Sequence, residues 1–272
     1  MSIKSDYHLH SFHSGDSDTP TEEIIQQGIA LGLTHLCFTQ HHDMAYPFSN
    51  EETPDLFVLN TDSYLYEFLL LKEKYQNQIS LCFGVELGLQ EHIAPLNAAY
   101  SASYPFDFII ASSHVCNRKD PYYPSFFDYR TDQEAFSEYF ESILSNIRVF
   151  SDFDVYGHLD YVVRYSPNKN KNYRYSQHAD ILDEILKSLI AQGKGIELNT
   201  GGFDRGLDTS NPCPDIIRRY HELGGEIITI GSDAHNPHGV GAHFDKAADI
   251  LRSCHFRHYT IFQNRKAEFI KL

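Results

Sequence analysis

Short apolar segments alternate with longer amphipathic segments along the whole chain. Seven short segments have the length and the continuous apolar character of strands that are buried on both faces. They cover residues 3–8, 34–39, 79–87, 106–112, 153–157, 194–198 and 226–231. Six longer segments have helical periodicity, and they cover residues 20–31, 56–75, 132–150, 178–192, 214–223 and 245–254. The pattern therefore predicts an α/β protein.

The order of these elements also predicts how the strands pair. Strands that alternate with helices form parallel sheets through right-handed crossovers. About seven such units is a number typical of a barrel rather than of an open sheet. The chain has 272 residues, close to the ~250 residues of a single α/β barrel. Because no Gly/Ser-rich linker interrupts it, we expect residues 1–272 to form one domain.

The bulk composition excludes several classes of protein. A mean hydropathy of −0.39 without a long apolar run argues against a membrane span. A formal net charge of −15 argues against a nucleic-acid partner, which usually meets a basic stripe. The short basic segments 168–174 and 257–271 are interpreted as solvated surface. A small phosphorylated substrate is still allowed, because bound metal ions reverse the local field.

The cysteines and the start of the sequence bear on the compartment. Cys37 and Cys82 lie inside predicted strands and are interpreted as small core residues rather than disulfide partners. Residues 1–6 contain no apolar segment of the kind found in secretory signals. We therefore expect a cytoplasmic protein. The oligomeric state is left open.

Potential metal ligands stand at the end of every predicted strand. In chain order they are His8 and His10, His41 and His42, Glu86, His114, His158 and Asp160, Glu197 and Asn199, and Asp233 and His235. The carboxyl ends of parallel barrel strands meet on one face, where sites are built from several strands. Alternate residues of a strand point the same way, so His8 and His10 can face one ion, and Asp233 and His235 repeat that spacing.

These motifs resemble those of the PHP (polymerase and histidinol phosphatase) family across nearly the whole chain. The motifs are His8-Leu9-His10, Thr39-Gln40-His41, Gly84-Val85-Glu86, Ser113-His114, Gly157-His158-Leu159-Asp160 and Gly231-Ser232-Asp233-Ala234-His235. The chain length and the segment Glu197-Leu198-Asn199-Thr200 are most similar to histidinol-phosphate phosphatases. The resemblance implies a distorted, TIM-like (β/α)7 barrel with its metal site at the carboxyl ends of the strands.

The resemblance also implies two or three divalent ions, with zinc, iron and manganese all suited to mixed ligands. The first ion would take His8, His10, Glu86 and Asp233. The second would take Glu86 as a bridge with His114 and His158. The third would take His41, His235 and one residue near position 16, where many relatives have histidine. Asp16 is our first choice for that ligand, and Asp18 and His13 are alternatives.

The implied reaction is the hydrolysis of L-histidinol phosphate to L-histidinol and phosphate, a step of histidine biosynthesis. A hydroxide between two ions would attack phosphorus, and His42 or Asp160 would protonate the leaving group. An arginine would bind the phosphate. Arg205 is the first choice, followed by Arg164 and then Arg118.

Other functions remain as alternatives at this point. A PHP-type enzyme acting on a nucleotide or another small phosphate ester is one. A barrel hydrolase of C–N bonds is less well matched, because no lysine ends a middle strand. A metal-storage protein would need a closed set of ligands. The long loop 117–129, rich in Pro and Tyr, is a candidate wall of a pocket, and an inert surface loop is the alternative.

Overall fold

The predicted apolar segments form a seven-stranded parallel sheet that curls into a barrel. The structure, a computed structural model, describes residues 3–47 and 55–272. Its strands follow one another in chain order across the sheet. They are β1 (Ser5–Leu9), β2 (His35–His42), β3 (Ser80–Gly88), β4 (Phe108–Ser112), β5 (Val155–Tyr156), β6 (Gly195–Asn199) and β7 (Ile228–Gly231). Each predicted strand is therefore confirmed, and β5 is the shortest of them.

The barrel closes between the end of β1 and the residues after β7. His10 N donates to Ala234 O at 2.9 Å, and Asp233 N donates to His8 O at 2.9 Å. The buried Asp6 side chain strengthens this seam, because it accepts hydrogen bonds from Ser232 Oγ at 2.6 Å and from Ser232 N at 3.0 Å. Because β1 and the segment after β7 are joined by only these few hydrogen bonds, the barrel is distorted. It is a TIM-like (β/α)7 barrel, as expected.

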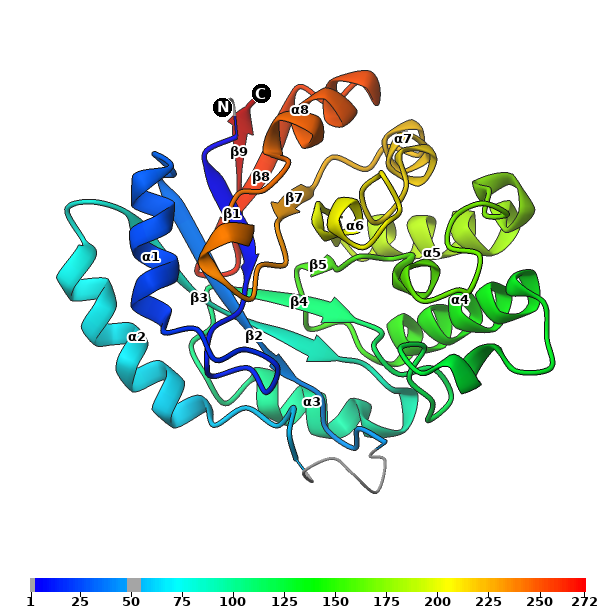
Figure 1. Cartoon of the computed structure of the whole chain (residues 1–272), viewed down its shortest axis with the longest axis horizontal. Helices are drawn as coiled ribbons and strands as arrows, with labels where there is room; N and C mark the ends of the chain where they lie inside the picture. The colour runs from blue at the N-terminus through cyan, green and yellow to red at the C-terminus, as the bar shows by residue number, and fades with distance from the viewer. Residues whose placement is uncertain (1–2, 48–54) are drawn as a thin grey trace.

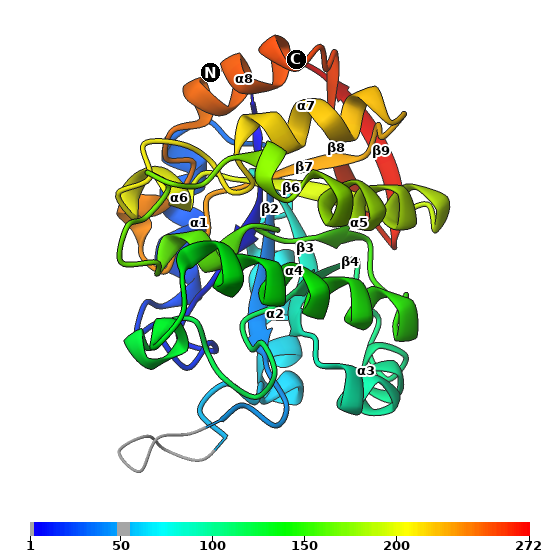
Figure 2. The ribbon, with the colours of Figure 1, turned by 90° about the vertical axis from the view of Figure 1, so that its right-hand side faces the viewer.

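Helices surround the strands (Figure 1), and Figure 2 shows α4, α5 and α7 side by side on one flank. The α-helices are α1 (Thr21–Ala30), α2 (Thr61–Tyr75), α3 (Ala94–Ser101), α4 (Asp132–Val149), α5 (Ala179–Ala191), α6 (Gly201–Asp204), α7 (Pro214–Glu222) and α8 (Phe244–Ser253). Short 3₁₀ helices occupy Glu91–Ile93, Pro124–Phe127, Tyr161–Arg164, Tyr175–Gln177 and Pro237–Gly239.

The helix boundaries follow local capping chemistry. α2 begins at Thr61, later than predicted, because the Asn60 side chain accepts a hydrogen bond from Ser63 N at 3.1 Å and so caps the helix there. α4 begins with a capping box formed by Thr131 and Glu134. The sequence analysis missed α3 and α6, which are too short to show a clear helical period.

The interpretation of residues 257–271 as solvated surface was wrong for residues 259–262, which are buried. The segment forms an antiparallel hairpin of β8 (His258–Gln263) and β9 (Lys266–Lys271). The β8 residues Tyr259, Ile261 and Phe262 are buried, whereas β9 is largely exposed. Tyr7 Oη donates to Phe262 O at 2.9 Å. The hairpin therefore covers the amino end of the barrel, opposite the predicted ligands.

Within the described residues, no helix has both the length and the apolar character that crossing a bilayer requires.

Candidate metal centre

Glu86, at the carboxyl end of β3, lies at the centre of a cluster of histidines. Its side chain is fully buried. Oε1 is 2.9 Å from His158 Nε2 and 3.1 Å from His114 Nε2. Oε2 faces three further rings, at 2.8 Å from His41 Nδ1, 3.3 Å from His8 Nε2 and 3.6 Å from His10 Nε2. The two oxygens of one carboxylate thus face five histidines from four sequence motifs and four strand ends.

Asp233 and His235 reach the cluster from the segment after β7. Asp233 Oδ1 is 3.8 Å from His8 Nε2 and 3.7 Å from His10 Nε2. Asp233 takes a left-handed backbone conformation, with φ 59°. The His235 ring stacks on that of His10, with centroids 4.2 Å apart. The structure therefore places these residues on the side of the cluster formed by the first histidine motif.

Asp16 completes the cluster on its outer side. Its Oδ2 lies 3.1 Å from His235 Nε2 and 3.5 Å from His41 Nε2. The two alternatives face elsewhere. His13 Nε2 is 2.9 Å from Glu67 Oε2 on α2, and Asp18 is exposed and does not line the cavity described below. All nine residues that the sequence analysis named as ligands therefore meet in one place.

The cluster contains buried polar atoms that have no hydrogen-bond partner among the described residues. They include His8 Nε2, His10 Nε2, His41 Nδ1, His235 Nε2 and Glu86 Oε2. Such atoms are rare in proteins because burying them without a partner is costly. Here they converge. Four overlapping triplets have ligand atoms within 4.8 Å of one another: His10/His41/His235, His8/His10/Asp233, His8/Glu86/His158 and His41/Glu86/His114. Imidazole nitrogens and carboxylate oxygens in this arrangement fit divalent transition-metal ions.

The pKa shifts of the cluster residues also support a metal site. Burial alone would raise the pKa of Glu86, but His8, His114 and His41 outweigh it and hold that pKa well below its usual range. Burial alone would lower the pKa of His8, but Glu197, Glu86 and Asp233 raise it well above 6.5. The carboxylates thus draw positive charge into the cluster, as a metal site does.

Outer hydrogen bonds orient several of the histidine rings. His8 Nδ1 lies 2.6 Å from Glu197 Oε1, and His114 Nδ1 lies 2.8 Å from Asp43 Oδ1. His235 Nδ1 lies 2.9 Å from the carbonyl of Asp233. Because an oxygen acceptor of this kind requires Nδ1–H, each of these rings presents a Nε2 lone pair to the cluster. Asp43 was missed by the sequence analysis, although it directly follows the His41-His42 pair.

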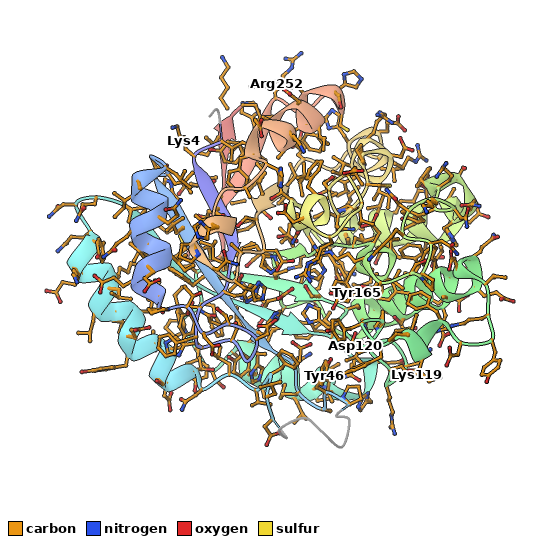
Figure 3. The ribbon with its side chains drawn as sticks, in the orientation of Figure 1. Lys4, Tyr46, Lys119, Asp120, Tyr165 and Arg252 are labelled. Carbon is orange, nitrogen blue, oxygen red and sulfur yellow. The ribbon has the colours of Figure 1, made fainter. Side chains whose placement is uncertain are left out.

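A cavity of about 290 Å³ opens next to the cluster. Its wall is largely aromatic, and Figure 3 labels Tyr46, Asp120 and Tyr165, three of its lining residues. Tyr122 and Tyr123 also line it, so the prediction that loop 117–129 forms a pocket wall is confirmed. Tyr46 Oη donates to Asp120 Oδ2 and so links two loops across the cavity. The cavity can hold a small molecule in contact with the cluster.

The three candidate arginines lie in different surroundings. Arg164 is almost fully buried, and its Nη1 donates to Asp233 Oδ2 at 2.8 Å. Its Nε and Nη2 donate to Asn211 Oδ1 at 2.7 Å and Asn199 Oδ1 at 2.8 Å. Arg164 also lines the cavity, but these hydrogen bonds hold its guanidinium against Asp233 and the two asparagines. Arg205 is exposed and lines the cavity.

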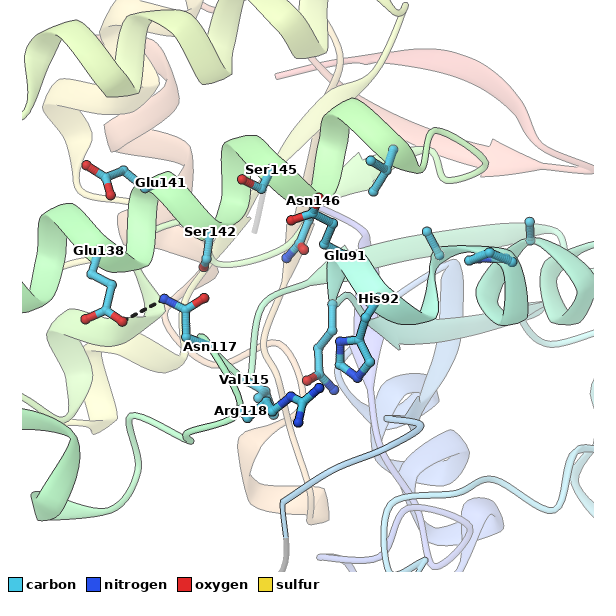
Figure 4. Close-up of a pocket in the computed structure, with 15 residues that line it drawn as sticks. Glu91, His92, Val115, Asn117, Arg118, Glu138, Glu141, Ser142, Ser145 and Asn146 are labelled. Carbon is cyan, nitrogen blue, oxygen red and sulfur yellow. Dashed lines mark hydrogen bonds between the residues drawn. The ribbon is translucent and has the colours of Figure 1, made fainter.

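Arg118 lies outside this cavity. It lines a second cavity of about 870 Å³ between α3 and α4, together with Glu91, His92 and Glu138 (Figure 4). None of the nine candidate ligands lines that second cavity. Arg118, the third choice for phosphate binding, is therefore not placed beside the cluster.

The two candidate proton donors do not line the cavity either. His42 points to the opposite face of β2 from His41, where its ring stacks on Tyr100 with centroids 3.8 Å apart and its Nδ1 accepts a hydrogen bond from Leu59 N at 3.2 Å. Asp160 is buried, and its oxygens accept hydrogen bonds from Asn211 Nδ2 at 2.6 Å and Cys213 N at 2.9 Å. The geometry thus places both side chains behind the cluster.

Comparison with known proteins places the chain in a family. A model of the PHP domain matches residues 6–201, and the chain belongs to this family. It is 31% identical to "Histidinol-phosphatase" of Lactococcus lactis subsp. lactis (strain IL1403) over 266 residues, covering 97% of this chain and 96% of that protein. It is 30% identical over 272 residues to "Probable histidinol-phosphatase" of Thermotoga maritima, covering 98% and 99%.

Two solved structures are also similar. The histidinol phosphate phosphatase from Lactococcus lactis, crystallised with zinc, L-histidinol and phosphate, superposes with a TM-score of 0.87 at 31% identity, covering 97% of this chain and 98% of that one. A structure from Listeria monocytogenes shares the fold, with a TM-score of 0.76 at 17% identity, covering 89% and 99%.

Proposed function

We propose that this protein is a metal-dependent phosphomonoesterase that hydrolyses L-histidinol phosphate to L-histidinol and phosphate, as a step of histidine biosynthesis. The observation that carries the proposal is the set of unpartnered imidazole nitrogens around Glu86, which opens onto a cavity of about 290 Å³. Two relatives that align with nearly the whole chain have names that include histidinol-phosphatase. One solved relative holds zinc, L-histidinol and phosphate.

The cluster would hold two or three divalent ions, with zinc, iron and manganese as candidates. His8, His10, Glu86 and Asp233 would hold the first ion. The second would lie between Glu86, His114 and His158, and the third between Asp16, His41 and His235. When bound, such ions lower the pKa of water and neutralise charge on the phosphoryl oxygens.

The residues of the cavity would bind the two halves of the substrate. Of the two arginines that line the cavity, Arg205 has a guanidinium without a hydrogen bond or ion pair among the described residues. We therefore assign it to the phosphoryl oxygens, where a bidentate contact stabilises the developing charge. Asp43 and Asp120 supply negative charge on the same wall, which suits the cationic amine of histidinol. Tyr122 and Tyr123 offer rings on which an imidazole can pack. Asp160 and Glu197 do not line the cavity and are not available for this role.

Two further assignments belong to this proposal. We propose that residues 1–272 act as one barrel domain, because the cluster draws its ligands from positions as far apart as His8 and His235. We also propose a cytoplasmic location, which the free state of all five cysteines supports.

The test is phosphate release by the purified protein from histidinol phosphate, from nucleoside monophosphates and from an aryl phosphate, with bound metal measured in the same samples. We expect histidinol phosphate to give the highest kcat/KM, and we expect complete chelation to abolish turnover. Preference for a nucleotide would contradict the substrate assignment, and activity that survives chelation would contradict the metal-dependent reaction.

A further inference from the structure

A chain of buried polar side chains leads away from His10 toward α2. His10 Nδ1 lies 3.0 Å from Ser14 Oγ, and Ser14 Oγ donates to Gln40 Oε1 at 2.8 Å. Gln40 Nε2 in turn donates to Ser11 Oγ at 2.8 Å. Each of these four residues is at most 2% exposed. The chain of side chains is therefore buried between the cluster and the outer helices.

The chain ends on a carboxylate. Thr21 Oγ1, in the first turn of α1, lies 3.0 Å from Ser11 Oγ and donates to Glu67 Oε2 at 2.7 Å. Threonine has one hydroxyl hydrogen, and an ionised carboxylate only accepts. The contact between Ser11 and Thr21 is then made by the Ser11 hydroxyl hydrogen. His13 Nε2 approaches the same Glu67 oxygen at 2.9 Å.

The direction of the first hydrogen bonds follows from one backbone contact. Ser11 N donates to Gln40 Oε1 at 2.9 Å, so this atom of the Gln40 amide must be the oxygen. Ser14 must therefore donate its single hydroxyl hydrogen to Gln40 Oε1. Its oxygen already accepts from His41 N at 3.1 Å. The remaining contact, with His10, can form only if His10 carries its hydrogen on Nδ1.

We propose that Gln40 is a positioning residue of the metal cluster, which acts through Ser14 to hold His10 in the tautomer whose Nε2 lone pair faces Glu86 and Asp233. The inference rests on the metal cluster of the proposed function. His8 and His114 each have a carboxylate directly on Nδ1. For His10 the serine hydroxyl replaces that carboxylate, and a hydroxyl can also donate. Gln40 removes this ambiguity because it takes up the hydroxyl hydrogen.

Without Gln40, Ser14 would be free to donate to His10 Nδ1. That hydrogen bond stabilises the opposite tautomer, whose Nε2–H points at the cluster and has no lone pair for a cation. The test is Gln40→Met, which keeps the side-chain length and removes both the oxygen and the nitrogen of the amide. Ser14→Ala is a second, milder variant. Gln192→Met is the matched control, because the Gln192 amide contacts Ile147 O and Ser188 Oγ, remote from the cluster.

Two measurements decide the inference. Zinc affinity is measured by competition with a chelator, and we expect it to fall about 10- to 100-fold in Gln40→Met and Ser14→Ala, the usual effect of losing an outer partner of a metal ligand. Gln192→Met should match the wild type. Imidazole ¹⁵N spectra of the metal-free protein, with His10 assigned by comparison with His10→Asn, should show a hydrogen on Nδ1 in the wild type and on Nε2 in Gln40→Met.

Unchanged zinc affinity in both variants, or a wild-type His10 that carries its hydrogen on Nε2, would overturn the inference. These results differ from a failure of the proposed function. A wild-type protein that binds no zinc, iron or manganese would contradict the proposed function, whereas the ¹⁵N comparison needs no metal and would still decide the role of Gln40.

Discussion

The two ends of the barrel both contain buried carboxylates, but they differ in whether the polar atoms around them are satisfied by hydrogen bonds within the protein. At the amino end, Asp154 Oδ2 accepts hydrogen bonds from Ile109 N at 2.8 Å and from Arg265 Nε at 2.6 Å. Asp107 accepts from Phe83 N at 3.0 Å and from Asn264 N at 3.1 Å. The carboxylates there fasten the C-terminal hairpin across the end of the barrel.

At the carboxyl end, three of the rings that face the Glu86 carboxylate, His8, His10 and His41, turn toward it a nitrogen that has no hydrogen-bond partner among the described residues. Residue type is therefore a poor guide to function in this fold, because aspartate and glutamate are buried at both ends. What separates a metal site from a structural contact is whether the polar atoms are satisfied by the protein alone. The comparison predicts that substitutions at the two ends will change different quantities.

The largest effect is expected for Glu86→Gln at the carboxyl end. This change removes the carboxylate that faces five histidines, so the protein should lose bound metal, and kcat should fall by more than the about 100-fold typical of an outer partner. Metal content and phosphate release measure both effects. The control is Glu91→Gln, the same change at an exposed residue of the second cavity. Full metal content in Glu86→Gln would contradict the central role of this carboxylate.

Arg205→Ala should separate substrate binding from metal binding at the same end. Loss of the free guanidinium should lower kcat/KM for histidinol phosphate about 100-fold, the scale of one lost contact to transition-state charge. Metal content should remain that of the wild type, because within the described part of the chain Arg205 forms no hydrogen bond or ion pair with any of the nine ligands. Arg118→Ala, in the second cavity, is the matched control. Equal kcat/KM in Arg205→Ala and Arg118→Ala would contradict the assignment of Arg205 to the phosphate site.

Asp154→Ala probes the amino end, where the expected change is in stability. Ile109 N and Arg265 would lose their shared acceptor, so the free energy of unfolding should fall by about 1–3 kcal/mol. Urea unfolding of the metal-free protein measures this change, and zinc affinity should stay at the wild-type value. Asp249→Ala removes an exposed pair with Arg252 and should stay within about 0.5 kcal/mol. Loss of zinc affinity in Asp154→Ala would show that the two ends are not independent.

Much of this arrangement was predictable from the sequence because two patterns are strong: the apolar segments, and the histidines and acids at their ends. Continuous apolar segments predicted all seven strands, and the position of histidines and acids at their ends predicted the cluster. The C-terminal hairpin was missed because β9 is largely exposed and its polar residues resemble surface. The roles of Arg164 and Asp160 depend on contacts with Asn211, a residue distant in sequence from both, and no local pattern reports such contacts.

His42, for which the sequence left open a role as proton donor or as a partner that supports a ligand, is a different case, because the sequence did contain the relevant signal. Neighbouring residues of a strand point to opposite faces. If His41 faces the cluster, His42 must face the outer helices, and the structure shows it stacked on Tyr100. The same alternation places Gln40 on the face of β2 that His42 occupies. Gln40 therefore lies on the side of His10 that is away from the cavity.

His42→Gln tests this reading and should have the smallest effect. Glutamine can still accept the hydrogen bond from Leu59 N, so the main loss is the stacking on Tyr100, worth about 0.5–1.5 kcal/mol of stability. The kcat should stay within about threefold of the wild type, which is less than 1 kcal/mol in activation free energy. A general acid would instead contribute about 10²- to 10⁴-fold. A loss of that size, in a variant with full metal content and cooperative unfolding, would show that His42 acts as a general acid. The His42 side chain would then have to turn into the cavity during the reaction.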